Sequence, residues 1–325
     1  MRERLARLTF RGNIWQVPGM KATILTDRGV VKVTGIDARK FLNGLVTTDM
    51  GKVTPSSPGF AALLTPQGKV IVDFIIADSD SPHGDDFYLD CPRALAPMLV
   101  ERLGFYKLRA KVVVEDVSAV VVVMAVWDGA APAHWGVCYA DPRLPELGLR
   151  CISPPYPADT AAAFGAELVD AAAFEAHRIK LGVPSGGLDF VYGDAFPHEA
   201  DMDQLHGVDF QKGCFVGQEV VARMEHRGSA RTRVVPVAFD DAPPALGIAV
   251  TAGGKPMGTM GSAAPGRGLA LLRLDRVGEA LASGTPLMAG NVELRLVKPP
   301  WARFAFPGDA VPGGSAAAPD AKAAP

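Results

Sequence analysis

The stretch QKGCFVGQEVVARM, residues 211–224, places one cysteine among groups that change thiol chemistry. Lys212 puts a positive charge next to Cys214, and the residues after it predict a helix that begins near Gly217. A neighbouring cation and the positive end of a helix dipole both favour the thiolate, which is the nucleophile and the metal ligand. The alternative is a packed cysteine that serves as a small buried hydrophobe.

The residues around this cysteine support its exposure. Gly213 and Gly217 would let the backbone bend sharply, and Glu219 in the first helical turn would complement the helix dipole. Three histidines flank the cysteine, so a cysteine-histidine pair acting in hydrolysis or group transfer is an open alternative: His198, His206 and His226. No closely spaced pair of histidines or cysteines fixes two ligands on one element, so we predict no metal site.

Other charged residues are candidates for holding a ligand. Asp73 stands in the strand pattern KVIVDFII, where it either faces solvent or binds a ligand, and Glu199 follows Pro197 in an expected loop. Arg223 and Arg227 are either helix-end charges or anion contacts, and solvated helix-end charge is the simpler interpretation of each.

The elements that must position these residues indicate an α+β fold. Residues 23–33 predict a hairpin, Asp37 is expected to cap a following helix, and residues 60–78 predict a second hairpin with its turn at 65–69. Helical spacing recurs over residues 92–108 and 161–181, and β-branched runs predict strands at 111–115 and 119–126. Strands and helices alternate without regular βαβ spacing, which favours α+β over a doubly wound sheet.

Four regions follow from this pattern. We expect a flexible extension over residues 1–19, an α+β domain over 20–230, a small all-β barrel or sandwich over 231–306, and a disordered tail rich in Pro, Gly and Ala over 307–325.

Composition bounds the function. The 325 residues are 48% hydrophobic and 21% charged, with a formal net charge of -2, so no global field recruits nucleic acid or an anionic membrane. The four cysteines are far apart and include no C-x-x-C pair, which predicts neither a zinc ribbon nor a disulfide framework and favours a reducing cytoplasm.

The motif KGCFVGQE, residues 212–219, resembles the K-G-C-[FY]-x-G-Q-E signature of the YgfZ family of folate-binding, aminomethyltransferase-like proteins that serve iron-sulfur cluster assembly and repair. Further landmarks lie at 33–49, 177–187 and 196–210, so the resemblance covers about residues 21–299. It implies ferredoxin-like α+β units around a central opening, a C-terminal β-barrel and a bound tetrahydrofolate.

The resemblance also implies a function. Cys214 would be the working thiol, shaped by Lys212, Gln218 and Glu219, in an accessory factor that contacts [4Fe-4S] client enzymes or A-type carrier proteins, with at most a transient cluster contact. Folate would be held by Asp73 or Glu199 at the pterin and by Arg223 or Arg109 at the glutamyl tail. The alternative is a folate-dependent aminomethyltransferase of the glycine-cleavage type, centred on Asp73.

Overall fold

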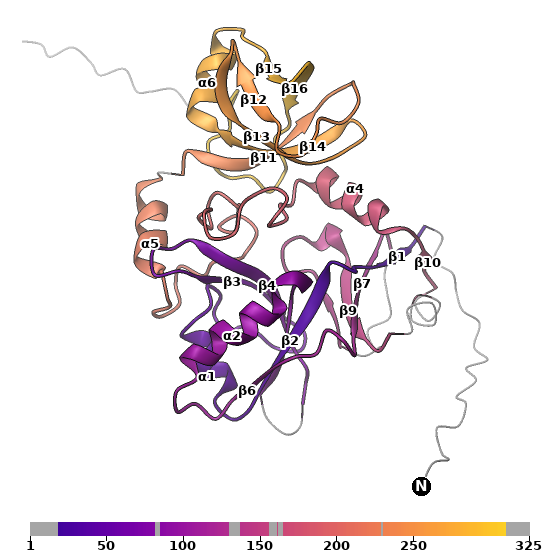
Figure 1. The fold of residues 1–325 in the computed structure, drawn as a ribbon, viewed down its shortest axis with the longest axis vertical. Helices are drawn as coiled ribbons and strands as arrows, with labels where there is room; N and C mark the ends of the chain where they lie inside the picture. Colours follow the sequence, from indigo (N-terminus) through magenta and orange to yellow (C-terminus); the bar gives the residue numbers. More distant parts are fainter. Residues whose placement is uncertain are drawn as a thin grey trace, which may run out of the picture.

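The computed structural model describes residues 19–81, 85–129, 137–155, 161, 165–228 and 230–309. The extension and the tail expected from the sequence lie almost wholly outside these residues. Within the described residues, no helix is long and apolar enough to cross a membrane. Three β-structures form the molecule, with the barrel at one end in Figure 1.

The first sheet has five strands in the order β3-β4-β5-β2-β6. In sequence order its strands are β2 (Arg28–Thr34), β3 (Gly59–Leu64), β4 (Val70–Asp78), β5 (Asp86–Pro92) and β6 (Val113–Asp116). One face carries α1 (Ala38–Asn43) and α2 (Ala96–Tyr106), which follows the short helix η1 (Arg93–Leu95). The other face packs toward the second sheet.

Period-2 alternation along β4 decides which side chains face which layer. Phe74 and Ile76 pack in the cluster with the helices, whereas Ile75 and Ala77 pack in the cluster shared with the second sheet. Asp73 therefore belongs to the layer between the two sheets, where it is 6% exposed. The strand position expected to face solvent or ligand is buried.

The second sheet also has five strands, in the order β10-β1-β7-β9-β8. These are β1 (Lys21–Ile24), β7 (Val122–Trp127), β8 (Val137–Ala140), β9 (Leu149–Ser153) and β10 (Glu167–Leu168), with the short helix η2 (Pro145–Leu147) before β9. Trp127 of β7 packs edge-on against Phe174 of α4 (Ala171–Leu181), with ring centroids 5.2 Å apart.

The predicted hairpin at residues 23–33 is wrong. Both strands exist, but β1 pairs with β7 and β10, whereas β2 pairs with β5 and β6, so the turn between them carries the chain from one sheet to the other. Periodicity reports which residues are extended and says nothing about their partners. The hairpin at 60–78 is confirmed as β3 and β4.

Two helix predictions also need correction. The helix expected over 161–181 begins at Ala171, because Asp170 accepts a hydrogen bond from the Ala172 amide and Glu167–Leu168 pair with β1. Asp37 does not cap α1 with its side chain; its Oδ2 instead accepts the Lys111 amide, at 2.7 Å.

A closed six-stranded barrel follows. Its strands are β11 (Thr232–Ala238), β12 (Ala249–Ala252), β13 (Lys255–Ala264), β14 (Arg267–Arg273), β15 (Leu287–Ala289) and β16 (Val292–Leu296). The region also contains α6 (Leu274–Ala282), which the all-β expectation missed; Leu274, Val277 and Ala280 bury its apolar face against the barrel core.

Candidate functional site

Cys214 lies in the loop that precedes α5 (Gln218–Arg227), and the structure leaves it exposed, whereas the other free cysteine, Cys91, is buried. The helix begins where the sequence predicted. Gly217 stands at its N-cap with φ +82°, a left-handed conformation that suits glycine. The sulfur is therefore presented to solvent about one turn ahead of the helix.

Gly217 also lets the loop approach the turn of the β3–β4 hairpin. A Cβ at this position would stand 2.5 Å from the Thr65 carbonyl oxygen and 3.1 Å from the Cα of Gly68. Gly213 differs, because a Cβ there would meet nothing within 4 Å and its φ is outside the left-handed range. Of the two glycines expected to bend the backbone, only Gly217 does so in a left-handed conformation.

Lys212 anchors the same loop. Its side chain is buried, and its Nζ donates hydrogen bonds to the carbonyl oxygens of Asn43, Val46 and Thr48 at 2.8, 2.6 and 2.7 Å. Burial lowers the pKa of Lys212 to about 8, against the opposing charges of Asp49 and Asp209. The ammonium group that was expected to act on the thiol thus binds carbonyl oxygens at the end of α1 and after it. Lys212 thereby fixes the position of the loop.

The rest of the motif lies on α5. Gln218 is half-buried and Glu219 is exposed in the first turn, where its carboxylate favours the helix dipole as expected. Glu219 also accepts a hydrogen bond from Arg223 one turn later, at 3.0 Å.

A cavity of about 850 Å³ opens beside the loop. Aromatic Phe60 and Phe210 line it together with the cationic Lys52 and Arg303, and Gln211 brings its wall to within three residues of Cys214. Lys52 is paired with Asp209 at 2.5 Å, and Asp209 also accepts the amides of the loop. The cavity has the size and the mixed aromatic and cationic lining of a small-molecule site.

The four residues expected to hold folate do not line this cavity. Asp73 accepts a hydrogen bond from the Tyr192 hydroxyl, and burial together with that carboxylate raises the pKa of Tyr192 well above its usual range. Glu199 accepts the Phe196 amide at 2.8 Å and so closes a turn. Arg223 is exposed on α5, and Arg109 is exposed in the loop after α2.

A buried polar network between the sheets escaped the sequence reasoning. Asp90, fully buried, accepts hydrogen bonds from Arg28, Tyr139 and Arg150. Arg150 also contacts Asp141, which forms two hydrogen bonds with the Arg143 guanidinium. The available signal was weak, because only Tyr139, Asp141 and Arg143 are close in sequence, and the pairing and packing of the strands bring the other members to them.

The histidines do not form a catalytic pair with the cysteine. His198 is buried with its Nε2 3.0 Å from the Glu225 carboxylate, while His206 and His226 are exposed. Among the described residues no hydrogen bond joins the Cys214 thiol to an imidazole.

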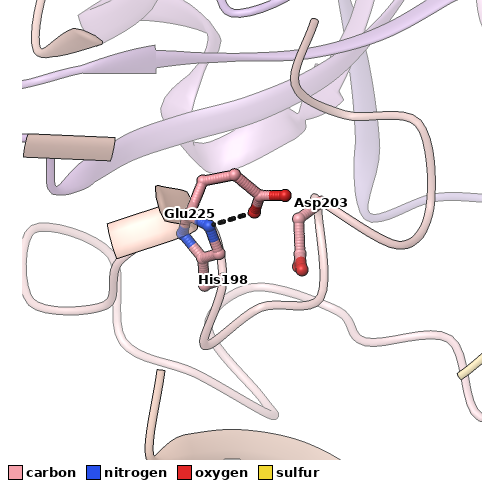
Figure 2. A group of neighbouring side chains, drawn as sticks. All are labelled: His198, Asp203 and Glu225. Carbon is pink, nitrogen blue, oxygen red and sulfur yellow. Dashed lines mark hydrogen bonds and ion pairs between the residues drawn. The ribbon is translucent and has the colours of Figure 1, made fainter. Parts of the chain in front are cut away.

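One group of side chains has the composition of a metal site. Ligand atoms of His198, Asp203 and Glu225 lie within 4.8 Å of one another, as Figure 2 shows. Arg233 of the barrel, however, donates to both carboxylate oxygens of Asp203, at 2.9 and 2.8 Å. The group therefore links α5, the 197–205 loop and β11 through complementary charges.

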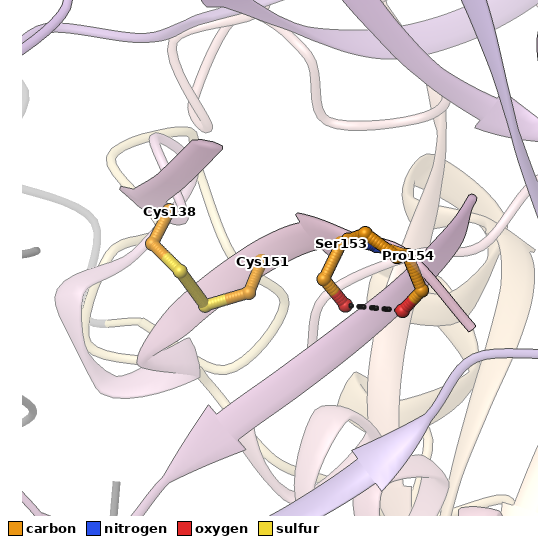
Figure 3. The surroundings of a disulfide bond; sticks show 4 residues. All are labelled: Cys138, Cys151, Ser153 and Pro154. Carbon is orange, nitrogen blue, oxygen red and sulfur yellow. Dashed lines mark hydrogen bonds between the residues drawn. A yellow bond between two sulfur atoms is a disulfide. The ribbon is translucent and has the colours of Figure 1, made fainter. Parts of the chain in front are cut away.

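A disulfide corrects the cysteine prediction. Cys138 and Cys151 stand directly opposite each other on β8 and β9 and are joined by a disulfide bond, which Figure 3 shows. Their separation of 13 residues gave no motif, because the pairing depends on strand register.

Comparison with known proteins places the chain in a family. Residues 231–304 match the domain described as "CAF17, C-terminal beta-barrel domain". Iron-sulfur cluster assembly factors named IBA57, mitochondrial, are similar to the chain. The Pyricularia oryzae protein is 32% identical, with 84% of this chain and 78% of that protein covered, and the human protein is 31% identical, with 78% and 77% covered.

A third relative is the IBA57 homologue of Mycosarcoma maydis, which is 39% identical over 228 residues. That match covers 65% of this chain, and the chain spans only 55% of the length of the relative.

Among solved structures, glycine cleavage system aminomethyltransferase T from Bartonella henselae superimposes with a TM-score of 0.68 at 15% identity, over 88% of this chain and 87% of that one. The fold is therefore the aminomethyltransferase-like α+β fold with a C-terminal barrel, as expected.

The chain belongs to the IBA57 family of iron-sulfur cluster assembly factors. The resemblance drawn from the Cys214 motif is confirmed at the level of iron-sulfur assembly proteins with an aminomethyltransferase-like fold, and the family itself is IBA57.

Proposed function

We propose that this chain assists iron-sulfur cluster assembly by presenting Cys214 to a cluster held by a carrier or client protein. The observation that carries the proposal is the placement of this thiol, which is exposed and set in a loop anchored by Lys212. A thiolate is a soft ligand for iron. On contact the thiol would lose its proton to solvent water, and the thiolate would donate an electron pair to a cluster iron in exchange for one of the ligands that the carrier or client supplies.

Anchoring makes such a ligand effective. A rigid loop loses little conformational entropy when its sulfur binds, because its backbone is already ordered. The three carbonyl contacts of Lys212 and the close packing of Gly217 on the hairpin turn both restrict the loop.

The relatives' names support the assignment at the level of cluster assembly. The test is rescue of [4Fe-4S] enzyme activity in a host that lacks its own copy. We expect Cys214→Ser to fail and Cys91→Ala, which removes the buried thiol, to succeed. Full rescue by Cys214→Ser at normal expression would contradict the proposal.

We further propose that a tetrahydrofolate-type ligand occupies the cavity beside the loop. A flat pterin can stack on the exposed ring of Phe210, and the anionic glutamyl tail favours the cationic Arg303. This assignment replaces Asp73, Glu199, Arg223 and Arg109 as the expected contacts.

Two variants separate the assignments. Phe210→Ala removes a partly exposed ring of the cavity and is expected to weaken tetrahydrofolate binding about tenfold. Arg223→Ala, on α5 and outside the cavity, is the control and should leave the dissociation constant unchanged. Both dissociation constants are measured by calorimetric titration. If Arg223→Ala weakens tetrahydrofolate binding and Phe210→Ala does not, the glutamyl tail is bound by Arg223 instead.

A further inference from the structure

Five large apolar side chains are exposed where the turn before α1, the end of α2 and the start of β6 meet. We call this surface the apolar corner, and its members with their exposed fractions are Ile36 80%, Phe105 65%, Tyr106 40%, Leu108 91% and Val113 49%. Single exposed apolar residues are normal on a protein surface, but a contiguous group of this kind marks an interaction site.

The three segments of the corner are held together. Val113 pairs with Thr34 at the end of β2, and the Lys111 amide donates to Asp37 beside Ile36. A Cβ on Gly35 would stand 2.2 Å from the Lys111 carbonyl oxygen, so the turn and the loop are in direct backbone contact. Figure 1 places α1, α2 and β6 together at the end of the molecule opposite the barrel.

Leu108, the most exposed member, also has an unfavourable backbone. Its φ is +39°, in the region where non-glycine side chains crowd their own backbone. Such strain persists where the surroundings enforce it and is often associated with function. The turn that enforces it is closed by the Ala110 amide, which donates to the Lys107 carbonyl at 2.7 Å.

Cationic side chains surround the apolar corner. Five of them are exposed on α1, on α2 and in the loop that follows α2, namely Lys40, Arg102, Lys107, Arg109 and Lys111. Acidic side chains are fewer: Asp37, beside Ile36, is half-buried and accepts the Lys111 amide, and Glu101 on α2 and Glu115 and Asp116 on β6 are exposed. Arg109, expected from the sequence to meet a folate tail, belongs to this cationic rim.

The position of the corner relates it to the thiol. Ile36 lies just before the N-terminus of α1, whereas Lys212 binds the carbonyl oxygens of Asn43 and the residues after it. Six helical residues, a length of about 9 Å, separate the two ends. A protein seated on the corner therefore reaches the Cys214 loop along α1.

We infer that the apolar corner docks a protein whose contact surface has an apolar pocket rimmed by carboxylates, and that Leu108 enters this pocket. Resting on the proposed function, the docked protein is the one that carries the cluster to Cys214. The apolar side chains supply affinity, and the cationic rim supplies orientation and a fast encounter.

Other occupants fit the charges less well. An anionic lipid surface would meet the carboxylates of Glu115 and Asp116, which continue along the same strand as Val113. A second copy of this chain would set one cationic rim against another.

The test measures binding of the full chain to a purified A-type iron-sulfur carrier. Leu108→Glu is expected to raise the dissociation constant at least about tenfold, whereas Leu246→Glu, an exposed leucine near the barrel at 56% exposure, leaves it unchanged. Leu108→Gly separates a loss of binding from misfolding, because glycine adopts a positive φ without strain. This variant should bind more weakly while its Tm stays unchanged or rises.

Several results would overturn the inference. The first is that the wild-type chain does not bind the carrier, and the second is that both Leu108 variants bind it with unchanged affinity. The third is that the Leu108 substitutions weaken only binding to phosphatidylserine vesicles or only self-association. Rescue assays separate this inference from the proposed function. If the Cys214→Ser variant binds the carrier but fails in rescue, the result supports both the docking inference and the proposed function. If this variant rescues fully, the result contradicts the proposed function, whatever the binding measurement gives.

Discussion

At the scale of single residues, the members of the Cys214 motif have separate tasks. Lys212 anchors the loop, Gly217 allows it to approach the β3–β4 turn, and Cys214 presents an exposed thiol. The sequence predicted the exposure of Cys214 but misassigned Lys212, because a sequence gives the charge of a side chain and not the direction in which it points.

Glycine substitutions test this division directly. Gly217→Ala places a Cβ against the Thr65 carbonyl in a left-handed conformation, and we expect the free energy of unfolding to fall by about 2–4 kcal/mol. Gly213→Ala, with open space around its Cβ, should change it by less than about 0.5 kcal/mol. Urea titrations of both variants check this, and equal effects would refute the packing role of Gly217.

The buried network predicts acid sensitivity. Burial opposes ionisation of Asp141, but Arg143 and Arg150 outweigh it and lower its pKa to about 2. Because the folded pKa lies below the unfolded value of 3.8, this carboxylate stabilises the fold above pH 3.8 and that stabilisation disappears as the pH falls through about 2. The pH-dependent part is about 2 kcal/mol.

The measurement is the stability difference between wild type and Asp141→Asn as a function of pH. It should be constant above pH 5 and shrink by about 2 kcal/mol between pH 4 and pH 2. Asp240→Asn removes an exposed pair with Arg295 and serves as the control with little pH dependence. A flat difference curve for Asp141→Asn would show that the pair does not titrate as described.

At the scale of elements, local periodicity predicted the extended and helical segments. Long-range contacts within each sheet determine which strands pair. The β3–β4 hairpin and the strands of the barrel follow from apolar alternation and turn residues. The separation of β1 from β2 could not be predicted, because each strand pairs with segments far along the chain. The burial of Asp73 has the same cause, since the second sheet covers that face.

The contact of Lys212 with the end of α1 and the chain after it is one of the contacts that restrict the loop carrying Cys214. Lys212→Met keeps the apolar stem but leaves three carbonyl oxygens without their donor, so we expect a loss of about 2–4 kcal/mol. Amide exchange of residues 211–217 should accelerate more than that of β3 or β4. Lys52→Met removes an exposed lysine paired with Asp209; it is the control and should change the free energy of unfolding much less than Lys212→Met does.

At the scale of the whole molecule, a buried ion pair of the α+β part joins that part to the barrel through hydrogen bonds with Ser262. Arg178 of α4 donates to Asp189 at 2.8 Å and to Ser262 of β13 at 2.8 Å, and Asp189 accepts both the amide and the hydroxyl of Ser262. No sequence motif predicted this contact, because Asp189 and Arg178 lie 73 and 84 residues from Ser262, the barrel residue that they bind.

Removing one partner of this network should loosen the barrel. Arg178→Leu leaves the buried Asp189 carboxylate without its counter-charge, which typically costs about 3–5 kcal/mol. We expect faster amide exchange in β13 and earlier proteolysis between α4 and the barrel. Arg273→Leu, which breaks an exposed pair with Asp275, should leave both unchanged; equal protection of β13 in the two variants would exclude a coupling role for Arg178.

The central claim is that one exposed sulfur works beside a folate-sized cavity. The most direct measurement is the rate of Cys214 alkylation by iodoacetamide in the full chain, with and without saturating tetrahydrofolate, followed by mass spectrometry. We predict that the ligand binds and slows alkylation several-fold in wild type, and that Phe210→Ala needs more ligand for the same protection. An alkylation rate that folate leaves unchanged, or a Cys214 that resists alkylation in the native protein, would contradict the account.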